Sequence, residues 1–246
     1  GNQFLTDLNE TDVLVHVVDF SGTTDVEGEH TTNHDPRDDI DFLEAELDAW
    51  YLDVLEKGIA AFETRYHGAE TSIDAELADQ MSAFGIGDDE MKRTILASSL
   101  ELDPDTWSDD DRARLAHEIR TRTKPMVVAA NKMDTAAARE NWASITADPD
   151  YDHLSFVPVS AHAEKALTNA AEAGVVEYTP GDADFEIVGD ISEEQRAGLG
   201  RIREHVAAYD GTGVQAVLDA AVFDVLGCIA AFPGSATGST DGAGGF

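Results

Sequence analysis

The sequence predicts an α/β fold in which a parallel sheet carries an all-helical insertion. Three short apolar runs are typical of strands: "VLVHVVD" at 13–19, "MVVAA" at 126–130 and "LSFVPV" at 154–159. Parallel strands that are buried on both faces have such nearly continuous apolar runs. Helical patterns separate the three runs, which favours crossover connections between parallel strands.

A long helical region lies between the first two predicted strands. From Pro36 to Tyr66, apolar residues recur mostly every three or four positions, which predicts one helix of several turns. The pattern breaks at Gly68, and three shorter helical patterns follow, at 73–84, 91–100 and 109–122. This region is too long for an ordinary crossover, so we expect an antiparallel helical unit over residues 36–122 that projects from the sheet.

Shorter helices are predicted around and after the third strand. The amphipathic stretches 135–145 and 163–173 have the length and position of crossover helices. Ser192, with Glu194 close behind, has the pattern of a helix start, and a last helical stretch covers 214–225.

The charge balance excludes several function classes. The 246 residues include 50 acidic and 16 basic residues, for a formal net charge of -34. Such a surface repels nucleic acid phosphates and anionic membranes, and no basic patch interrupts it, so we expect no direct DNA binding and no membrane association. The acidic residues are spread along the whole chain, a pattern that resembles proteins of a salt-loving cytoplasm. Disorder caused by high charge is the alternative, and the apolar periodicity disfavours it.

Cysteine content and hydropathy also favour a cytoplasmic location. A single cysteine, Cys228, excludes an internal disulfide framework and fits a reducing compartment. No apolar run approaches the roughly 18 residues that a membrane span needs. The C-terminal "GSATGSTDGAGGF" is rich in glycine and serine, as linkers are.

Polar residues follow two neighbouring predicted strands at the point where each strand ends. The sequence "NKMD" at 131–134 comes directly after the second strand, and Ser160 and Ala161 come directly after the third. In a parallel sheet, loops at the carboxyl ends of neighbouring strands open onto the same crevice, where ligands bind. We therefore expect these two loops to form one binding site.

The chemistry of these side chains suits a guanine base. The Asp134 carboxylate can accept two hydrogen bonds, from N1–H and from the 2-amino group, which adenine does not offer in that arrangement. Lys132 can lay its methylene stem over the base while its ammonium stays in water. Asn131 can bridge the neighbouring loop to the base edge, and the Ala161 backbone N–H can reach guanine O6.

Two other interpretations remain open. The polar sequence after the second strand can be a plain strand end, followed by a helix N-cap at Asp134 or Thr135. The loop after the first strand also offers four residues for a metal site: Asp25, His30, His34 and Asp35. This loop is polar and lacks helical spacing, which is more typical of a solvated loop.

Five segments, spread over essentially all 246 residues, carry a resemblance to a known family. The chain resembles the archaeal branch of the YchF (Obg-like) subfamily of P-loop GTPases in "HVVDFSGTTDVEGEHTTNHDPRDDIDFLEAELDAW", "KPMVVAANKMD", "VPVSAHAEKAL", "AAEAGVVEYTPGDADFEI" and "GTGVQAVLDAAVFDVLGCIAAFP". The resemblance implies a G domain with a helical insertion, followed by a small TGS domain. It also implies guanine as the base, because the full reading motif is present, and it implies these nucleotide-binding residues: Asn131, Lys132, Met133, Asp134, Ser160 and Ala161.

The chain departs from the family in one respect. The phosphate-binding sequence G-x-x-x-x-G-K-[ST] does not occur in the 246 residues. The resemblance implies that the switch region and the Mg²⁺ ligands precede Gly1. We therefore expect a partial P-loop GTPase with a first G-domain segment at 1–35, the helical insertion at 36–122, a second G-domain segment at 123–228, and a linker or the start of a TGS domain at 229–246.

Two functions follow from this interpretation. In the first, the chain is the guanine-recognition portion of a GTPase that uses GTP and Mg²⁺ and is not hydrolytic alone. In the second, the chain is an interaction module whose helical insertion docks on a ribosomal or other translation-associated partner.

Overall fold

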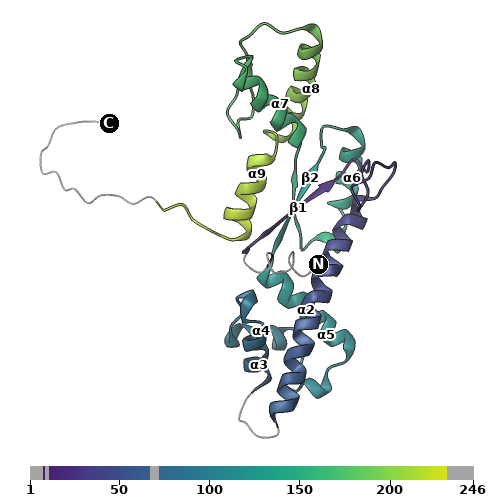
Figure 1. Ribbon diagram of the computed structural model, residues 1–246, viewed down its shortest axis with the longest axis vertical. Coiled ribbons are helices and arrows are strands. Elements are labelled where there is room, and N and C mark those ends of the chain that lie inside the picture. Colours follow the sequence, from purple (N-terminus) through teal and green to yellow (C-terminus); the bar gives the residue numbers. More distant parts are fainter. Residues whose placement is uncertain (1–7, 9–10, 67–71, 232–246) are drawn as a thin grey trace, which may run out of the picture.

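A computed structural model of the chain describes residues 8, 11–66 and 72–231. Its centre is a parallel sheet of three strands in the order β1-β2-β3, formed by β1 (Leu14–Asp19), β2 (Met126–Asn131) and β3 (Ser155–Pro158). All three lie where the apolar runs predict strands. The predicted fold class, α/β with a parallel sheet and many helices, is confirmed (Figure 1).

The register of the sheet aligns the carboxyl ends of the strands. Asp19, the last residue of β1, is opposite Asn131, the last residue of β2, and Ala130 is opposite Pro158 in β3. Residues that directly follow the three strands therefore emerge along one edge of the sheet, where ligands bind in open α/β folds.

Different helices cover the two faces of the sheet. On one face, Val18, Val128 and Ala130 pack in a core with α6 (Ala136–Ile145) and the first turns of α2 (Pro36–Tyr66). On the other face, the side chains of β2 and β3 pack against α9 (Val214–Asp219) and the π-helical η4 (Ala220–Val225).

The chain between β1 and β2 is helical in every element that the structure describes. The long helix α2 is followed by α3 (Ile73–Gln80), η1 (Ser82–Phe84), α4 (Asp88–Ala97), η2 (Pro104–Thr106) and α5 (Asp109–Thr123). These elements share a core of their own, centred on Tyr51, Leu77, Met91 and Ile119. In Figure 1, α2 runs from the sheet to the far end of this unit and packs along α5. The predicted break at Gly68 lies outside the described residues.

The chain between β3 and α9 forms a second extension, at the opposite end of the molecule (Figure 1). It contains α7 (Ala161–Glu172), a short antiparallel pair of β4 (Val176–Glu177) with β5 (Glu186–Ile187), and α8 (Glu193–Tyr209). Ser192 caps α8 through a capping box with Gln195. The β4–β5 pair was not predicted, because strands of two residues are too short to give a periodic pattern.

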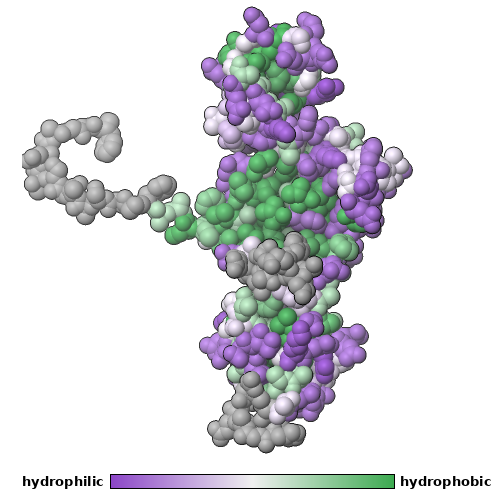
Figure 2. Space-filling model, in the orientation of Figure 1, coloured by the Kyte–Doolittle hydropathy of each residue, from purple (hydrophilic) through white to green (hydrophobic). Residues whose placement is uncertain are grey.

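Apolar surface gathers over the middle of the molecule, around the sheet and α9, whereas both extensions are mostly hydrophilic (Figure 2). Large exposed apolar side chains come from β1, α9 and η4, and they include Val15, Val17, Leu218, Val222 and Phe223. None of the described helices combines the length and the apolar character that crossing a membrane requires.

Candidate functional site

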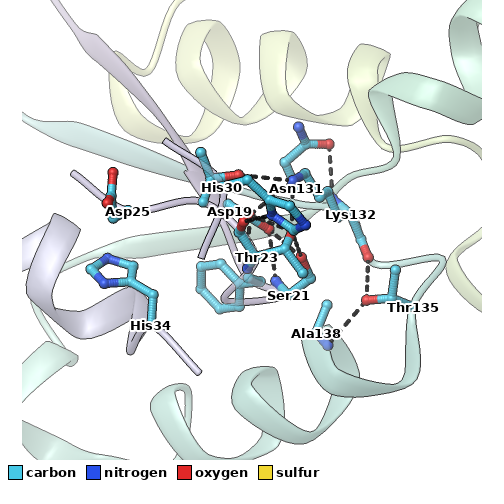
Figure 3. A network of polar contacts seen from close by, with 12 residues as sticks. Asp19, Ser21, Thr23, Asp25, His30, His34, Asn131, Lys132, Thr135 and Ala138 are labelled. Carbon is cyan, nitrogen blue, oxygen red and sulfur yellow. Dashed lines mark hydrogen bonds and ion pairs between the residues drawn. The ribbon is translucent and has the colours of Figure 1, made fainter. Parts of the chain in front are cut away.

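The loop after β2 turns sharply away from the sheet. Lys132 has a positive φ of 66°, which ends the strand and redirects the chain. The Thr135 N–H and hydroxyl both donate to the Lys132 carbonyl, at 2.9 Å each, and the Thr135 hydroxyl accepts from Ala138 N–H at 3.2 Å (Figure 3). Thr135 is therefore the N-cap of α6. The cap explains where the helix starts, but it leaves the side chains of Asn131, Lys132 and Asp134 to be explained by other contacts.

Asn131 joins the loop after β2 to the loop after β3. Its Oδ1 accepts from the backbone N–H of Lys132 at 2.9 Å and from that of Ala161 at 3.2 Å. The Ala161 N–H, which was expected to reach guanine O6, donates to Asn131 in this structure. The Asn131 side chain is therefore one of the links that hold the two loops together.

Asp134 is exposed to solvent and is held in place by the loop after β3. Its Oδ1 accepts from the Ser160 hydroxyl at 2.7 Å, and the Asp134 side chain is exposed. Ser160 is fully buried, with its hydroxyl oxygen accepting from Ala163 N–H at 3.2 Å and its own N–H donating to Thr212 O at 2.8 Å. The carboxylate is therefore fixed in orientation while it still faces solvent.

The Lys132 ammonium is hydrogen-bonded to protein groups, whereas the sequence-based expectation placed it in water. It donates to Asp19 Oδ2 at 2.8 Å and to the hydroxyls of Thr23 and Thr24 at 3.0 Å each (Figure 3). The expectation was wrong because it considered the lysine alone, whereas the sheet register places the end of β1 directly beside it.

Asp19 is the centre of a tight turn after β1. One carboxylate oxygen accepts from the Ser21 N–H at 2.9 Å and the Ser21 hydroxyl at 2.6 Å, and the other accepts from the Thr23 N–H at 3.2 Å and hydroxyl at 3.0 Å. Burial acts to raise the pKa of Asp19, but the hydrogen bonds from Lys132 and the turn outweigh it and hold the pKa far below its usual value. Asp19 is therefore a carboxylate at any physiological pH.

Met133, the third residue of the "NKMD" sequence, takes a structural position. Its side chain is fully buried in the core beneath α6. Its N–H donates to Val159 O at 3.0 Å, and its carbonyl accepts from Arg139 Nε at 3.2 Å. The methionine anchors the loop, so any contact of Met133 with a ligand would be made by its backbone.

The chain is similar to known GTP-binding proteins. Residues 129–235 match the family described as "Obg-like GTPase YGR210-like, G4 motif-containing domain". A GTP-binding protein of Methanocaldococcus jannaschii is 35% identical over 235 residues, and one of Schizosaccharomyces pombe is 31% identical over 242 residues. These similarities support an Obg-like GTPase family.

A solved structure has the same fold. The crystal structure of a GTP-binding protein from Pyrococcus horikoshii OT3 superimposes with a TM-score of 0.73 at 37% identity and covers 91% of this chain. The alignment covers 60% of that structure, and the chain spans 58% of the length of each curated relative.

Four of the predicted nucleotide-binding residues line two cavities. Asp134 and Ser160 line a cavity of about 670 Å³ that continues between α7 and α8. Asn131 and Lys132 line a second cavity, of about 660 Å³, which continues along the outer side of β1 past Asp19. The sequence predicted one shared crevice, whereas in the structure these residues line two different cavities.

Three elements of the site were missed by sequence reasoning. The turn at 19–24 holds Lys132, and the loop "DGTG" at 210–213 holds Ser160 through Thr212. The third is His205, which is buried near Met133, Asp134 and Thr212, and whose pKa is lowered by that burial. The glycine-rich "DGTG" ahead of a helical pattern is a turn signal, but nothing local indicates that it contacts the loop after β3.

The residues considered for a metal site are engaged in other contacts. His30 Nδ1 lies 2.7 Å from Thr23 O, and His34 Nε2 lies 3.1 Å from Asp39 Oδ1. Within residues 8, 11–66 and 72–231, no group of three or more histidine, cysteine or acidic side chains is arranged to hold a metal ion.

Proposed function

We propose that this chain binds the guanine base of GTP and is the base-reading portion of an Obg-like GTPase. The observation that carries the proposal is the Asp134 carboxylate, which is exposed, oriented by Ser160 and set close to Lys132 in the loop at the carboxyl edge of the sheet. The similarity to proteins described as GTP-binding supports the same ligand.

The donors and acceptors of the site fit guanine better than adenine. A carboxylate has about four lone-pair positions, so Asp134 can accept from guanine N1–H and the 2-amino group while it retains Ser160. Adenine offers no such pair of donors, and its N1 lone pair would face the carboxylate. An acceptor left without its donor costs about 1–3 kcal/mol, which favours guanine by about tenfold to a hundredfold.

Hydrolysis of GTP belongs to the proposal for the longer Obg-like protein. The backbone cradle of G-x-x-x-x-G-K-[ST] is not among the 246 residues, so we expect this chain alone to bind GTP weakly and not to hydrolyse it. Mg²⁺ would accompany the triphosphate, held by residues that the resemblance places before Gly1. The matched family is described as Obg-like and YGR210-like. Assignment to the YchF branch is a finer proposal, which rests on the resemblance of the five segments quoted above. A cytoplasmic location is proposed on the same basis.

The proposal is tested by competition binding of GMP, AMP and XMP to the 246-residue chain in molar KCl. All three ligands carry one phosphate, so their ratios report on the base. We expect GMP to bind at least about tenfold tighter than AMP. In Asp134→Asn, the preference should move toward XMP, because the new amide donates to the 2-oxo group of xanthine.

Asp103→Asn is the matched control, because it removes the same charge from a cap in the helical unit. It should leave all three affinities unchanged. If Asp134→Asn keeps the wild-type ratio of GMP to XMP, Asp134 does not read the base and the loop is only a strand end with a helix cap.

A second candidate is a partner-docking module, which the projecting helical unit favours (Figure 1). Its partner would be ribosomal or otherwise associated with translation, as the resemblance implies. Binding of ribosomes that depends on the helical unit and is indifferent to GMP would support this candidate over the first.

A further inference from the structure

We propose that Asp19, Thr23 and Thr24 are positioning residues that fix Lys132 as a shelf for the bound base. The inference rests on the proposed function, since it assigns these residues to the guanine site. It goes beyond that function because none of the three belongs to the reading loops after β2 and β3.

The Lys132 ammonium has an oxygen acceptor for each of its three protons. Asp19 Oδ2 lies 2.8 Å from Nζ, and the Thr23 and Thr24 hydroxyls each lie 3.0 Å from it. A lysine ammonium has three donors and no acceptor, so this set satisfies it completely. Two of the three partners are neutral hydroxyls. Their hydrogen bonds fix the position of the ammonium, whereas Asp19 alone would be enough to neutralise its charge.

The acceptors are themselves fixed. The side chain of Asp19 is only 11% exposed, and the turn from Ser21 to Thr23 gives it four hydrogen bonds in addition to the one from Lys132. The following residues are closed by a bridge between Thr24 and His30. The turn therefore presents its oxygens without needing the lysine to organise them.

The backbone end of Lys132 is fixed as well. Its N–H donates to Asn131 Oδ1 and its carbonyl accepts from Thr135, while its φ of 66° sets the direction of the side chain. With both ends held, the methylene stem forms a fixed apolar ledge at the cavity that continues along β1. Ordering such a side chain only on binding would weaken affinity, so a lysine that is ordered beforehand improves it.

In this geometry, Lys132 contributes to the affinity for any purine, and Asp134 contributes to the choice between purine bases. A methylene stem packs on the face of any purine, whereas Asp134 contacts the edge that differs between bases. Loosening Lys132 should therefore weaken GMP and IMP by the same factor, because IMP differs from GMP only in lacking the 2-amino group. Loss of Asp134 should instead reduce the ratio between them.

The first measurement concerns Lys132 without any ligand. The chain has five lysines, so the ammonium signal of Lys132 in a ¹⁵N–¹H spectrum can be assigned by substituting them singly. We expect a sharp Lys132 signal in the wild type, because three hydrogen bonds slow proton exchange. The signal should broaden or vanish in Asp19→Asn and weaken in Thr24→Val.

Asp25→Asn is the matched control for the Lys132 signal and for the nucleotide titration described next. Asp25 lies in the same loop and accepts from the Glu27 and Glu29 N–H groups, but its side chain lies away from Lys132 (Figure 3). It should keep the wild-type Lys132 signal and the wild-type affinities.

The second measurement is titration with GMP and IMP. Asp19→Asn should lower both affinities by about three- to tenfold at a constant ratio, as expected when one long side chain must be ordered on binding. Thr24→Val keeps the Asp19 turn, so it should lower the affinities for GMP and IMP by a smaller factor, again at a constant ratio. Thr24→Val also replaces Asp19→Asn as the test if Asp19→Asn does not fold.

The outcomes separate the two proposals. A Lys132 signal unchanged in Asp19→Asn, or a lost signal with unchanged affinities, overturns the positioning role and leaves guanine reading intact. If the wild type binds GMP no better than IMP or AMP, the proposed function fails, and the positioning role fails with it even where Lys132 is ordered.

Discussion

At the scale of single residues, Gly213 decides how the loops of the site approach one another. Its φ is +86°, and a Cβ placed on it would lie 1.9 Å from the Pro158 carbonyl oxygen. Gly213 directly follows Thr212, whose carbonyl accepts from Ser160. Only a residue without a side chain allows the chain to pass close enough to β3 for this contact.

Gly213→Ala should therefore destabilise the chain by about 3 kcal/mol or more, from strained backbone combined with the clash. Gly174→Ala separates the two causes, because Gly174 also has a positive φ, of +67°, but a Cβ placed on it would meet no atom within 4 Å. It should cost only about 1 kcal/mol. Urea denaturation of both variants measures the difference, and equal losses would show that the close approach to Pro158 is unimportant.

At the scale of elements, the contact between α2 and α5 combines an apolar core with one buried cation. The Arg120 side chain is 1% exposed, and it donates to Asp48 at 2.7 Å and to Glu44 at 2.8 Å. His117 and His153 contact the same two carboxylates at 2.9 Å each. His153 precedes β3, so the network joins the helical unit to the sheet as well as helix to helix.

Arg120→Met should cost about 3 kcal/mol at pH 7, because it leaves two carboxylates partly buried without their main partner. Burial raises the pKa of Asp48, but the hydrogen bonds from His117 and Arg120 outweigh it and lower the pKa. That lowered pKa contributes stability above the ordinary value of 3.8 and loses it in acid. The cost of Arg120→Met should therefore shrink as the pH falls through this range.

Arg114→Met is the control for this prediction, because Arg114 is 51% exposed and pairs with Asp111 within α5. It should change the free energy of unfolding by less than about 0.5 kcal/mol. Denaturant titrations at pH 7 and pH 3 test both variants, and a cost for Arg120→Met that grows in acid would contradict the assignment.

At the scale of the whole molecule, the dominant feature is the net charge of -34. Like charges at this density repel one another and oppose the compact state. The Debye length falls from about 10 Å at 0.1 M salt to about 3 Å at 1 M, so molar salt removes most of this repulsion between exposed groups. We propose on this basis that the protein functions in a salt-rich cytoplasm.

The melting temperature should rise by about 5 °C or more between 0.1 M and 2 M KCl, which corresponds to roughly 2 kcal/mol for a chain of this size. Sucrose is the control, since it strengthens apolar burial without screening charge. A melting temperature that responds to sucrose but is indifferent to KCl would refute the proposal.

Much of the fold could be predicted from the sequence because local periodicity and burial determine it. The run "MVVAA" is apolar at every position, which only a strand buried on both faces requires, and it forms β2. The three- and four-residue spacing from Pro36 to Tyr66 corresponds to α2 at both ends. The grouping of Asn131, Lys132 and Asp134 was visible for the same reason, since these residues are neighbours in the chain.

Tertiary structure alone decided what these side chains contact. Lys132 meets Asp19 across 113 residues of sequence, and Ser160 meets Thr212 across a complete helical extension. No local pattern encodes such pairs, because they depend on the order and register of β1, β2 and β3 and on the close approach at Gly213. The sequence by itself determined which residues could read a base, and the packing of the sheet determined how they are held.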